Sequence, residues 1–133
     1  VVRDVGAFRG RFTTYDVWNE LLHERRFVDE CGLWADTVKD AFRWAHEADP
    51  TAMLCVNEYA LIDGEDWHDL ITLVSTWLSE GVPVHCIGVQ AHVKPDLATE
   101  LIKYRLDRLA VVGLPLYITE LDVQSGWDPV SQT

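Results

Sequence analysis

Basic side chains are scarce in this chain of 133 residues. Lys and Arg number 11 against 22 Asp and Glu, which gives a formal net charge of -11. Binding to a phosphate backbone requires clustered Lys and Arg, so this balance argues against a nucleic-acid partner. No apolar run approaches the roughly 20 residues of a membrane-spanning helix, and we expect no membrane contact. The length allows one domain or part of one.

The signatures of cofactor and metal sites are also missing. No G-x-G-x-x-G or G-x-x-x-x-G-K-[ST] motif follows an apolar segment, and H-E-x-x-H is absent. The three cysteines, Cys31, Cys55 and Cys86, have no C-x-x-C spacing, so neither a zinc finger nor a disulfide framework is indicated. Cys55 and Cys86 lie within apolar strand patterns, and we interpret them as buried free thiols. We expect no cofactor and no metal.

What the chain does contain is one recurring unit: an amphipathic helix, a break at Gly or Asp-Pro, and a short apolar strand that ends in polar residues. After a helix that ends near residue 10, further helices are predicted at 34–48, 65–80 and 96–112. Strands are predicted at 12–19, 52–57, 84–90 and 116–121. Strands that alternate with helices form a parallel sheet. Four such strands make about half of a (β/α)8 barrel, so we predict an α/β fold in which residues 1–133 form a partial barrel.

Two of the predicted strands end on an acidic residue. Glu20 follows Asn19 at the end of the first strand, and Glu120 follows Thr119 near the end of the fourth. In barrels and doubly wound sheets the C-terminal ends of the strands carry the site. Cleavage of a glycosidic bond requires one carboxyl group that protonates the leaving oxygen and another that attacks or activates water. Glu20 and Glu120 are therefore candidate catalytic residues, although each alone is typical of an ordinary surface carboxylate.

A second Asn-Glu pair competes with the first. Asn57 and Glu58 end the second predicted strand in the same way that Asn19 and Glu20 end the first. Composition and spacing do not decide which of the two pairs takes part in chemistry.

The third predicted strand and its extension carry Gly88, Gln90 and His92 on one face, because side chains alternate along a strand with period 2. Gly88 leaves space, while the other two are polar. A lone histidine is most often a satisfied structural residue. Beside an inward-facing Gln at the edge of a parallel sheet, His92 equally suits a carboxylate or a sugar hydroxyl.

Three aromatic residues, Tyr59, Trp18 and Trp127, are candidate platforms for stacking against a sugar. For Trp18 we favour packing between the sheet and a helix. Trp127 falls in the polar tail, which is predicted to be loop. The pair His23 and Glu24 is interpreted as solvated.

With these residues in hand, the chain resembles family 10 of the glycoside hydrolases, the main family of endo-β-1,4-xylanases. Four segments carry the resemblance. Residues 15–20, Y-D-V-W-N-E, resemble the family's fourth-strand W-D-V-V-N-E, and residues 54–59, L-C-V-N-E-Y, resemble its fifth-strand L-x-I-N-D-Y. Residues 87–92, I-G-V-Q-A-H, resemble the sixth-strand I-G-x-Q-G-H, and residues 118–122 resemble the seventh-strand I-T-E-L-D. The resemblance implies that the chain covers roughly strands 4 to 7 of the barrel.

The resemblance implies that Glu20 is the general acid/base and Glu120 the nucleophile of a retaining, double-displacement mechanism. That mechanism requires carboxyl groups about 5–5.5 Å apart. Glu58 then falls on the fifth strand of the family barrel, where Asp is usual, and is not catalytic.

The resemblance also implies roles for five further residues. Asn19 would bind the 2-hydroxyl of the sugar that undergoes cleavage, and His92 would hydrogen-bond the nucleophile. Gln90 would lie nearby and Tyr59 toward the leaving-group side. Asp122 would support the site from behind.

The implied function is cleavage of internal β-1,4-xylosidic bonds in xylan or xylo-oligosaccharides, with the help of barrel strands that these residues do not contain. Trp18, Ala60 and Ala91 depart from the family pattern. One alternative is a non-catalytic carbohydrate-binding protein, or one that self-associates through open sheet edges. Another is a clan relative that acts on a different β-glycan. The chain starts without Met or a signal-peptide pattern, and we expect it to be part of a longer chain that is secreted or held at the cell surface.

Overall fold

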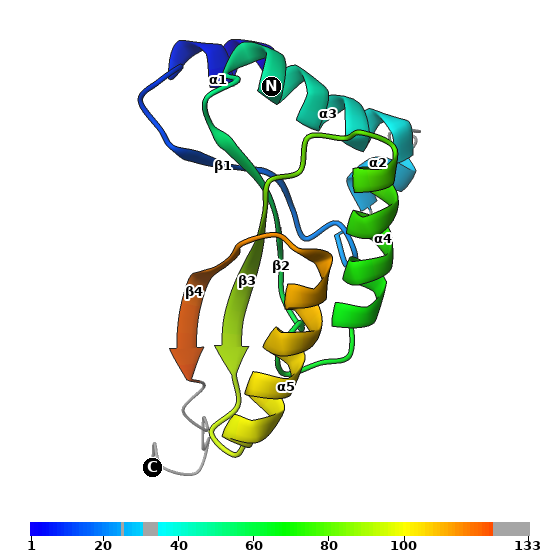
Figure 1. Ribbon diagram of the computed structural model, residues 1–133, viewed down its shortest axis with the longest axis vertical. Helices are drawn as coiled ribbons and strands as arrows, with labels where there is room; N and C mark the ends of the chain where they lie inside the picture. The colour runs from blue at the N-terminus through cyan, green and yellow to red at the C-terminus, as the bar shows by residue number, and fades with distance from the viewer. Residues whose placement is uncertain (25, 31–34, 124–133) are drawn as a thin grey trace, which may run out of the picture.

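The computed structural model describes residues 1–24, 26–30 and 35–123, and its centre is a four-stranded sheet (Figure 1). The strands are β1 (Thr14–Asn19), β2 (Met53–Glu58), β3 (Cys86–Val93) and β4 (Leu116–Val123). They pair in the order β1-β2-β3-β4, and every pair is parallel. The predicted α/β fold with parallel strands and intervening helices is therefore confirmed.

Helices connect the strands. They are α1 (Val2–Ala7), α2 (Arg26–Glu30), α3 (Ala35–Ala48), α4 (Trp67–Ser79) and α5 (Thr99–Leu109), with the 3-10 turn η1 (Ala110–Val112) after α5. Helices α4 and α5 contact each other and lie together on one side of β3 and β4 (Figure 1). Helix α1 packs against α3. Of the described helices, none combines the length and the apolar character that crossing a membrane requires.

The core lies between the sheet and these helices. The apolar faces of α3 and α4 supply Phe42, Val74 and Trp77, and the rings of Phe42 and Trp77 are 5.7 Å apart. Opposite them, β2 and β3 are buried along almost their whole length. Near-continuous apolar runs are expected of strands that are covered on both faces.

The element boundaries differ from the prediction at several points. The short helix α2 was not predicted, and β3 continues to Val93, past the predicted end at residue 90. Helix α5 begins at Thr99, later than the predicted start at residue 96, and Ala98 before it has an extended backbone. The polar tail, predicted to be loop, lies almost entirely outside the described residues.

The prediction that Cys55 and Cys86 are free thiols is wrong. The two residues are direct partners in the pairing of β2 with β3, their Cα atoms are 4.6 Å apart, and they form a disulfide. A Cα separation of this size is within the range that disulfides span. Both cysteines are buried, as predicted. Cys31 lies outside the described residues.

The two outer strands are far more exposed than the two inner ones. Along β4 every residue after Leu116 is exposed, including Tyr117, Ile118, Leu121 at 73% and Val123 at 60%. Apolar side chains on an outer strand with unpaired backbone groups favour pairing with a further strand. The edge formed by β4 therefore has the character of a surface that another segment covers.

Candidate active site

The C-terminal ends of all four strands meet at one edge of the sheet. In the strand pairing Asn19 lies beside Asn57, Asn57 beside Gly88, and Gln90 beside Glu120. Because parallel strands place their carboxyl ends together, polar residues that are up to a hundred positions apart in sequence become neighbours.

A hydrogen-bonded network of amides joins the two candidate carboxylates. Gln90 Nε2 donates to Glu20 Oε1 at 3.0 Å and to Asn19 Oδ1 at 3.2 Å. Asn57 Nδ2 donates to the same Asn19 oxygen at 2.9 Å and to Glu120 Oε1 at 3.3 Å. Gln90 and Asn57 are each only 3% exposed. The buried amides of the two inner strands thus hold the carboxylates of the two outer strands in one array, which we call the carboxylate network.

Asn57 is the member of this network that the sequence analysis did not single out. It was grouped with Glu58 as a competing Asn-Glu pair, and no role was given to it. The signal was nonetheless present, because Asn57 and Asn19 end adjacent parallel strands and such ends lie at the same edge.

Gly88 makes room for Asn57. A Cβ atom at residue 88 would lie 2.3 Å from Asn57 Oδ1, 3.0 Å from Asn57 Cγ and 3.0 Å from Thr119 Cγ2. Thr119 Oγ1 in turn donates to Asn57 Oδ1 at 2.7 Å. A side chain at residue 88 would therefore displace the amide that links Glu120 to the rest of the network.

Glu20 adopts an unusual backbone conformation. Its φ angle is +60°, in the left-handed region that costs a non-glycine residue about 1–2 kcal/mol. Its N–H donates to the Asn57 carbonyl at 2.8 Å, and its own carbonyl accepts the N–H of Glu24 at 2.7 Å. Strain of this kind persists where surrounding contacts over-determine the conformation, and it is frequent at active sites. The left-handed turn directs the chain out of β1 at the point where Glu20 joins the network.

His92 lies between two carboxylates. Its Nε2 is 3.1 Å from Glu120 Oε2, and its Nδ1 is 2.7 Å from Asp122 Oδ2. The hydrogen bond to Asp122, helped by the negative charges of both carboxylates, raises the pKa of His92 although burial opposes the shift. An imidazolium donates from both nitrogens, so the charged form of His92 satisfies both acceptors at once.

A third carboxyl group lies close to Glu120. Burial, and secondarily the charge of Glu120, raise the pKa of Asp16. Asp16 lies on β1, at the point where the pairing with β2 shifts register. Negative charge is thus concentrated on this side of the sheet.

Glu58 is separate from the carboxylate network. It is completely buried, and its oxygens accept hydrogen bonds from the backbone of the turn after Glu20 and from His23 Nδ1, the latter at 2.8 Å. The interpretation of His23 as solvated is wrong, because its ring is largely covered and stacks on Tyr59 with centroids 3.8 Å apart. Tyr59 is thereby placed beside the turn that carries Glu20.

Of the other two aromatic candidates, only Trp18 lies among the described residues. Trp18 is half-buried and packs against the hydrophobic core, in the way that the sequence favoured. Trp127 lies outside the described residues. In the part of the chain that the structure describes, no group of three His, Cys, Asp or Glu side chains is arranged to hold a metal ion.

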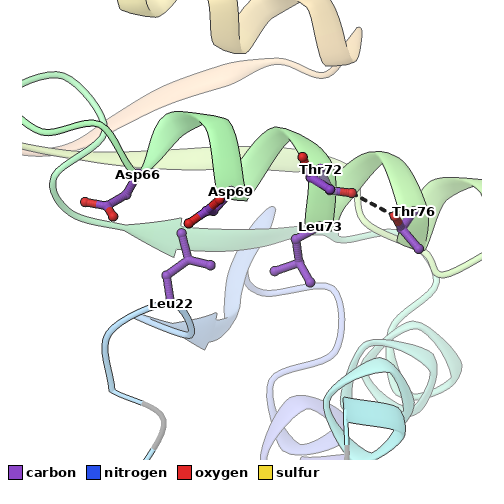
Figure 2. Close-up of a pocket in the computed structure, with 6 residues that line it drawn as sticks. All are labelled: Leu22, Asp66, Asp69, Thr72, Leu73 and Thr76. Carbon is purple, nitrogen blue, oxygen red and sulfur yellow. Dashed lines mark hydrogen bonds between the residues drawn. The ribbon is translucent and has the colours of Figure 1, made fainter.

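A pocket of about 440 Å³ opens elsewhere, between the turn after β1 and one face of α4 (Figure 2). Its lining consists of Leu22, Asp66, Asp69, Thr72, Leu73 and Thr76. No member of the carboxylate network lines this pocket. This pocket is therefore distinct from the candidate site at the strand ends.

Known proteins resemble this chain over most of its length. The family model for glycosyl hydrolase family 10 matches residues 1–132. The chain belongs to this family. Among curated relatives, endo-1,4-beta-xylanase 2 of Arabidopsis thaliana is 39% identical over 122 residues, and the endo-1,4-beta-xylanase of Geobacillus stearothermophilus is 34% identical over 131 residues. These alignments cover 89% and 90% of this chain but only 11% and 38% of the relatives.

Solved structures of family 10 enzymes show the same architecture. Xylanase XynB from Paenibacillus barcinonensis superposes with a TM-score of 0.85 at 29% identity, and covers 96% of this chain and 41% of its own. An endoxylanase from a sugarcane soil metagenome superposes with a TM-score of 0.84 at 28% identity, over 99% of this chain and 41% of its own. The four strands and their helices therefore fit part of a family 10 (β/α)8 barrel. Two glutamate-to-alanine mutants of the xylanase TsXylA from Thermoanaerobacterium saccharolyticum were solved with xylotriose and with xylotetraose.

Proposed function

We propose that residues 1–133 are part of the catalytic barrel of a retaining endo-β-1,4-xylanase. The observation that carries this proposal is the carboxylate network, in which buried amides of β2 and β3 connect Glu20, just after β1, with Glu120 on β4. Family membership supports xylan or xylo-oligosaccharides as the substrate. Loss of a glutamate in the TsXylA mutants that were solved with xylo-oligosaccharides is in line with a glutamate-based mechanism.

In the first step Glu120 attacks the anomeric carbon while Glu20 donates a proton to the glycosidic oxygen. The C–O bond to the leaving sugar breaks, and a covalent glycosyl-enzyme forms through a Glu120 oxygen. In the second step Glu20 accepts a proton from water, which attacks the anomeric carbon and releases Glu120. Two inversions retain the β configuration.

Three polar residues would serve these steps. Asn19 Oδ1 already accepts hydrogen bonds from Gln90 and Asn57. The Asn19 Nδ2 group would therefore be the donor of a hydrogen bond to the 2-hydroxyl of the sugar. Gln90 would fix the orientation of Glu20. His92, held by Asp122, would orient the nucleophile and keep it anionic.

The proposed activity requires barrel strands beyond the four described here. Apolar side chains along β4 are exposed, and Glu120 and His92 retain side-chain exposures of 44% and 35%. A neighbouring strand would cover this edge and complete the sugar-binding groove. Pairing with a second copy would cover the same edge. Sedimentation at several protein concentrations separates these cases, because only self-pairing gives a concentration-dependent mass.

An oxidising location fits the disulfide between Cys55 and Cys86, because disulfides persist mainly in secreted and cell-surface proteins. We infer that the protein acts outside the cell or at its surface. Mass spectrometry of protein from its natural source, alkylated before reduction, would detect the disulfide-linked peptides. Free thiols in that material would contradict the assignment.

The test uses the shortest polypeptide that contains this chain and hydrolyses xylan, called here the active polypeptide. Glu20→Ala and Glu120→Ala should each lower turnover of xylan by about 10²-fold or more. Glu100→Ala, at an exposed position of α5, is the matched control and should leave turnover unchanged. The first product seen by NMR should be the β anomer. Normal turnover by either site variant, or an initial α anomer, would refute the mechanism, and a panel of xylan, cellulose and mannan would identify the glycan.

A further inference from the structure

Glu58 is a buried carboxylate that the proposed mechanism does not use. Its exposure is 0%, and it accepts three hydrogen bonds. Oε2 accepts the Leu22 N–H at 2.8 Å, while Oε1 accepts the Tyr59 N–H at 3.0 Å and lies 2.8 Å from His23 Nδ1. A buried charge is tolerated only when it is paired and hydrogen-bonded, and Glu58 meets this condition with groups from two different turns.

The first of these turns contains Glu20. The Glu20 N–H donates to the backbone carbonyl of Asn57, and two residues later the Leu22 N–H donates to the side chain of Glu58. The turn is therefore attached to the end of β2 at two successive points. Between them lies the φ angle of +60° at Glu20. Strained conformations need external contacts to hold them, and Glu58 provides one of these contacts from a fixed strand.

The second connection passes through His23. Its Nδ1 faces Glu58, its Nε2 is 3.4 Å from Asp66 Oδ2, and its ring stacks on Tyr59 with an interplanar angle of 21°. Burial lowers the pKa of His23, but the hydrogen bonds and charges of Glu58 and Asp66 outweigh burial and raise it. An imidazolium between two carboxylates holds the Tyr59 ring against the turn.

We propose that Glu58 is a positioning residue for the acid/base Glu20 and, through His23, for Tyr59. The proposal rests on the proposed function, since it gives a second residue to the acid/base half of that mechanism. It assigns no proton transfer to Glu58. It predicts that loss of the carboxylate impairs protonation of the leaving group rather than attack by Glu120.

The obvious objection is that Glu58 serves only stability, and the chain offers a matched control for it. Asp49 is also completely buried, and it accepts the backbone N–H groups of Gly10 and Thr51. It lies before β2, at the end of the strand away from the carboxylate network. Replacement of either carboxylate removes a buried acceptor, but only Glu58 contacts the turn of Glu20.

The test compares Glu58→Gln with Asp49→Asn in the active polypeptide. A glutamine replaces one carboxylate oxygen by an NH2 group, so either Leu22 or the Tyr59 and His23 pair loses its acceptor. Each variant is assayed with xylotetraose, whose sugar leaving group needs a proton. It is also assayed by the rapid release of phenolate from 2,4-dinitrophenyl β-xylobioside, whose leaving group needs none.

For Glu58→Gln we expect turnover of xylotetraose to fall about tenfold or more, which is a part of the 10²–10⁴-fold that a general acid supplies. Phenolate release in the first turnover should change by less than about twofold. Later turnovers should be slower than the first, so that phenolate appears in a burst, because Glu20 must also activate water in the second step. Asp49→Asn should change the two substrates by equal factors, whatever its effect on thermal stability. An equal loss on both substrates in Glu58→Gln, or no loss on either, overturns the positioning role.

Two further variants, His23→Phe and Glu20→Ala, distinguish failure of the positioning role from failure of the proposed function. If Glu58→Gln does not fold, His23→Phe keeps a ring on Tyr59 while removing the bond to Glu58, and it should show the same dependence on leaving group to a smaller degree. Equal effects on both substrates in His23→Phe would overturn the proposal. If Glu20→Ala hydrolyses xylan normally, the proposed function itself is wrong. If Glu20→Ala is inactive and Glu58→Gln is normal, only the positioning role fails.

Discussion

Replacement of Gly88 by alanine should disable the site without touching either carboxylate. The added methyl group would lie 2.3 Å from Asn57 Oδ1 and 3.0 Å from both Asn57 Cγ and Thr119 Cγ2. The φ angle of Gly88 is not in the left-handed region, so alanine meets no backbone penalty there. The clash is thus the whole perturbation, and the Asn57 side chain has to move.

Movement of Asn57 breaks three hydrogen bonds, to Asn19, Glu120 and Thr119. At roughly 0.5–1.5 kcal/mol for each bond, their loss costs about 1.5–4.5 kcal/mol. Overpacking of a tight interior by one methyl group costs about 1–3 kcal/mol, so the two estimates agree near 2–3 kcal/mol. Turnover should fall by about 10²-fold, because displacement of a catalytic group by about 1 Å has that effect.

A double-mutant cycle in the active polypeptide tests the cause. Urea unfolding and xylan turnover are measured for Gly88→Ala, Asn57→Ala and the double variant. Asn57→Ala removes the two Asn57 atoms that clash and leaves only the contact with Thr119 Cγ2, so Gly88→Ala should cost less than about 1 kcal/mol in that background. Gly6→Ala in α1 is the control, because its Cβ meets nothing within 4 Å. An equal cost of Gly88→Ala in both backgrounds would refute the reasoning.

Three other predictions concern the disulfide, His92 and Arg105. Replacing both Cys55 and Cys86 by alanine should lower the free energy of unfolding by about 3.7 kcal/mol, because the disulfide closes a loop with a sequence separation of 31; an unchanged urea midpoint would contradict it. Folding raises the pKa of His92. The stabilisation that the charged ring gives the folded protein is therefore complete below the unfolded pKa of about 6.5, and it is lost as the pH rises through the folded pKa. In NMR titrations, Asp122→Asn should therefore lower the His92 midpoint, since the bond to Asp122 is the largest cause of the shift, and an unmoved midpoint would sink this explanation. Arg105→Met should destabilise the fold by roughly 1–3 kcal/mol, because it leaves the buried backbone carbonyl that Arg105 binds without that donor; thermal denaturation measures it, and a change below about 0.5 kcal/mol would count against it.

The strands and long helices could be predicted from the sequence because each carries its own periodicity and ends at a Gly or Pro break. Helix α2 has only five residues, which is too short for a helical period to show. The disulfide between Cys55 and Cys86 depends on the register of β2 against β3, and register is a property of the folded sheet rather than of either segment. The pattern within each segment therefore predicts its helix or strand, whereas the contacts between segments are seen only in the folded structure.

The rival Asn-Glu pairs show the same limit at the site. Glu20 and Glu58 follow an asparagine on adjacent strands, yet they differ in the backbone. Glu20 leaves its strand through a left-handed turn, whereas Glu58 is the last residue of β2 and keeps its side chain inside. The resemblance to a known family favoured Glu20 over Glu58 by chain position, but it did not reveal that Glu58 contacts the turn of Glu20. Nor did it reveal that Asn57 links the network to Glu120.

The two halves of the carboxylate network differ in how completely they are enclosed. On the side of Glu20, the proposed acid/base, Gln90 and Glu58 are buried, and the bonds to the Glu20 turn described above come from β2, β3, the turn itself and Asp66, which precedes α4. On the side of Glu120, the proposed nucleophile, Glu120 and His92 are partly exposed, and β4 presents apolar side chains to solvent. Hydrogen bonds between charged groups strengthen as water is excluded, so a strand that covers β4 would strengthen the bonds between Glu120 and His92 more than those of Glu20. We therefore expect the position of Glu20 to depend on contacts within the described residues, and the position of Glu120 to depend more on the segment that covers β4.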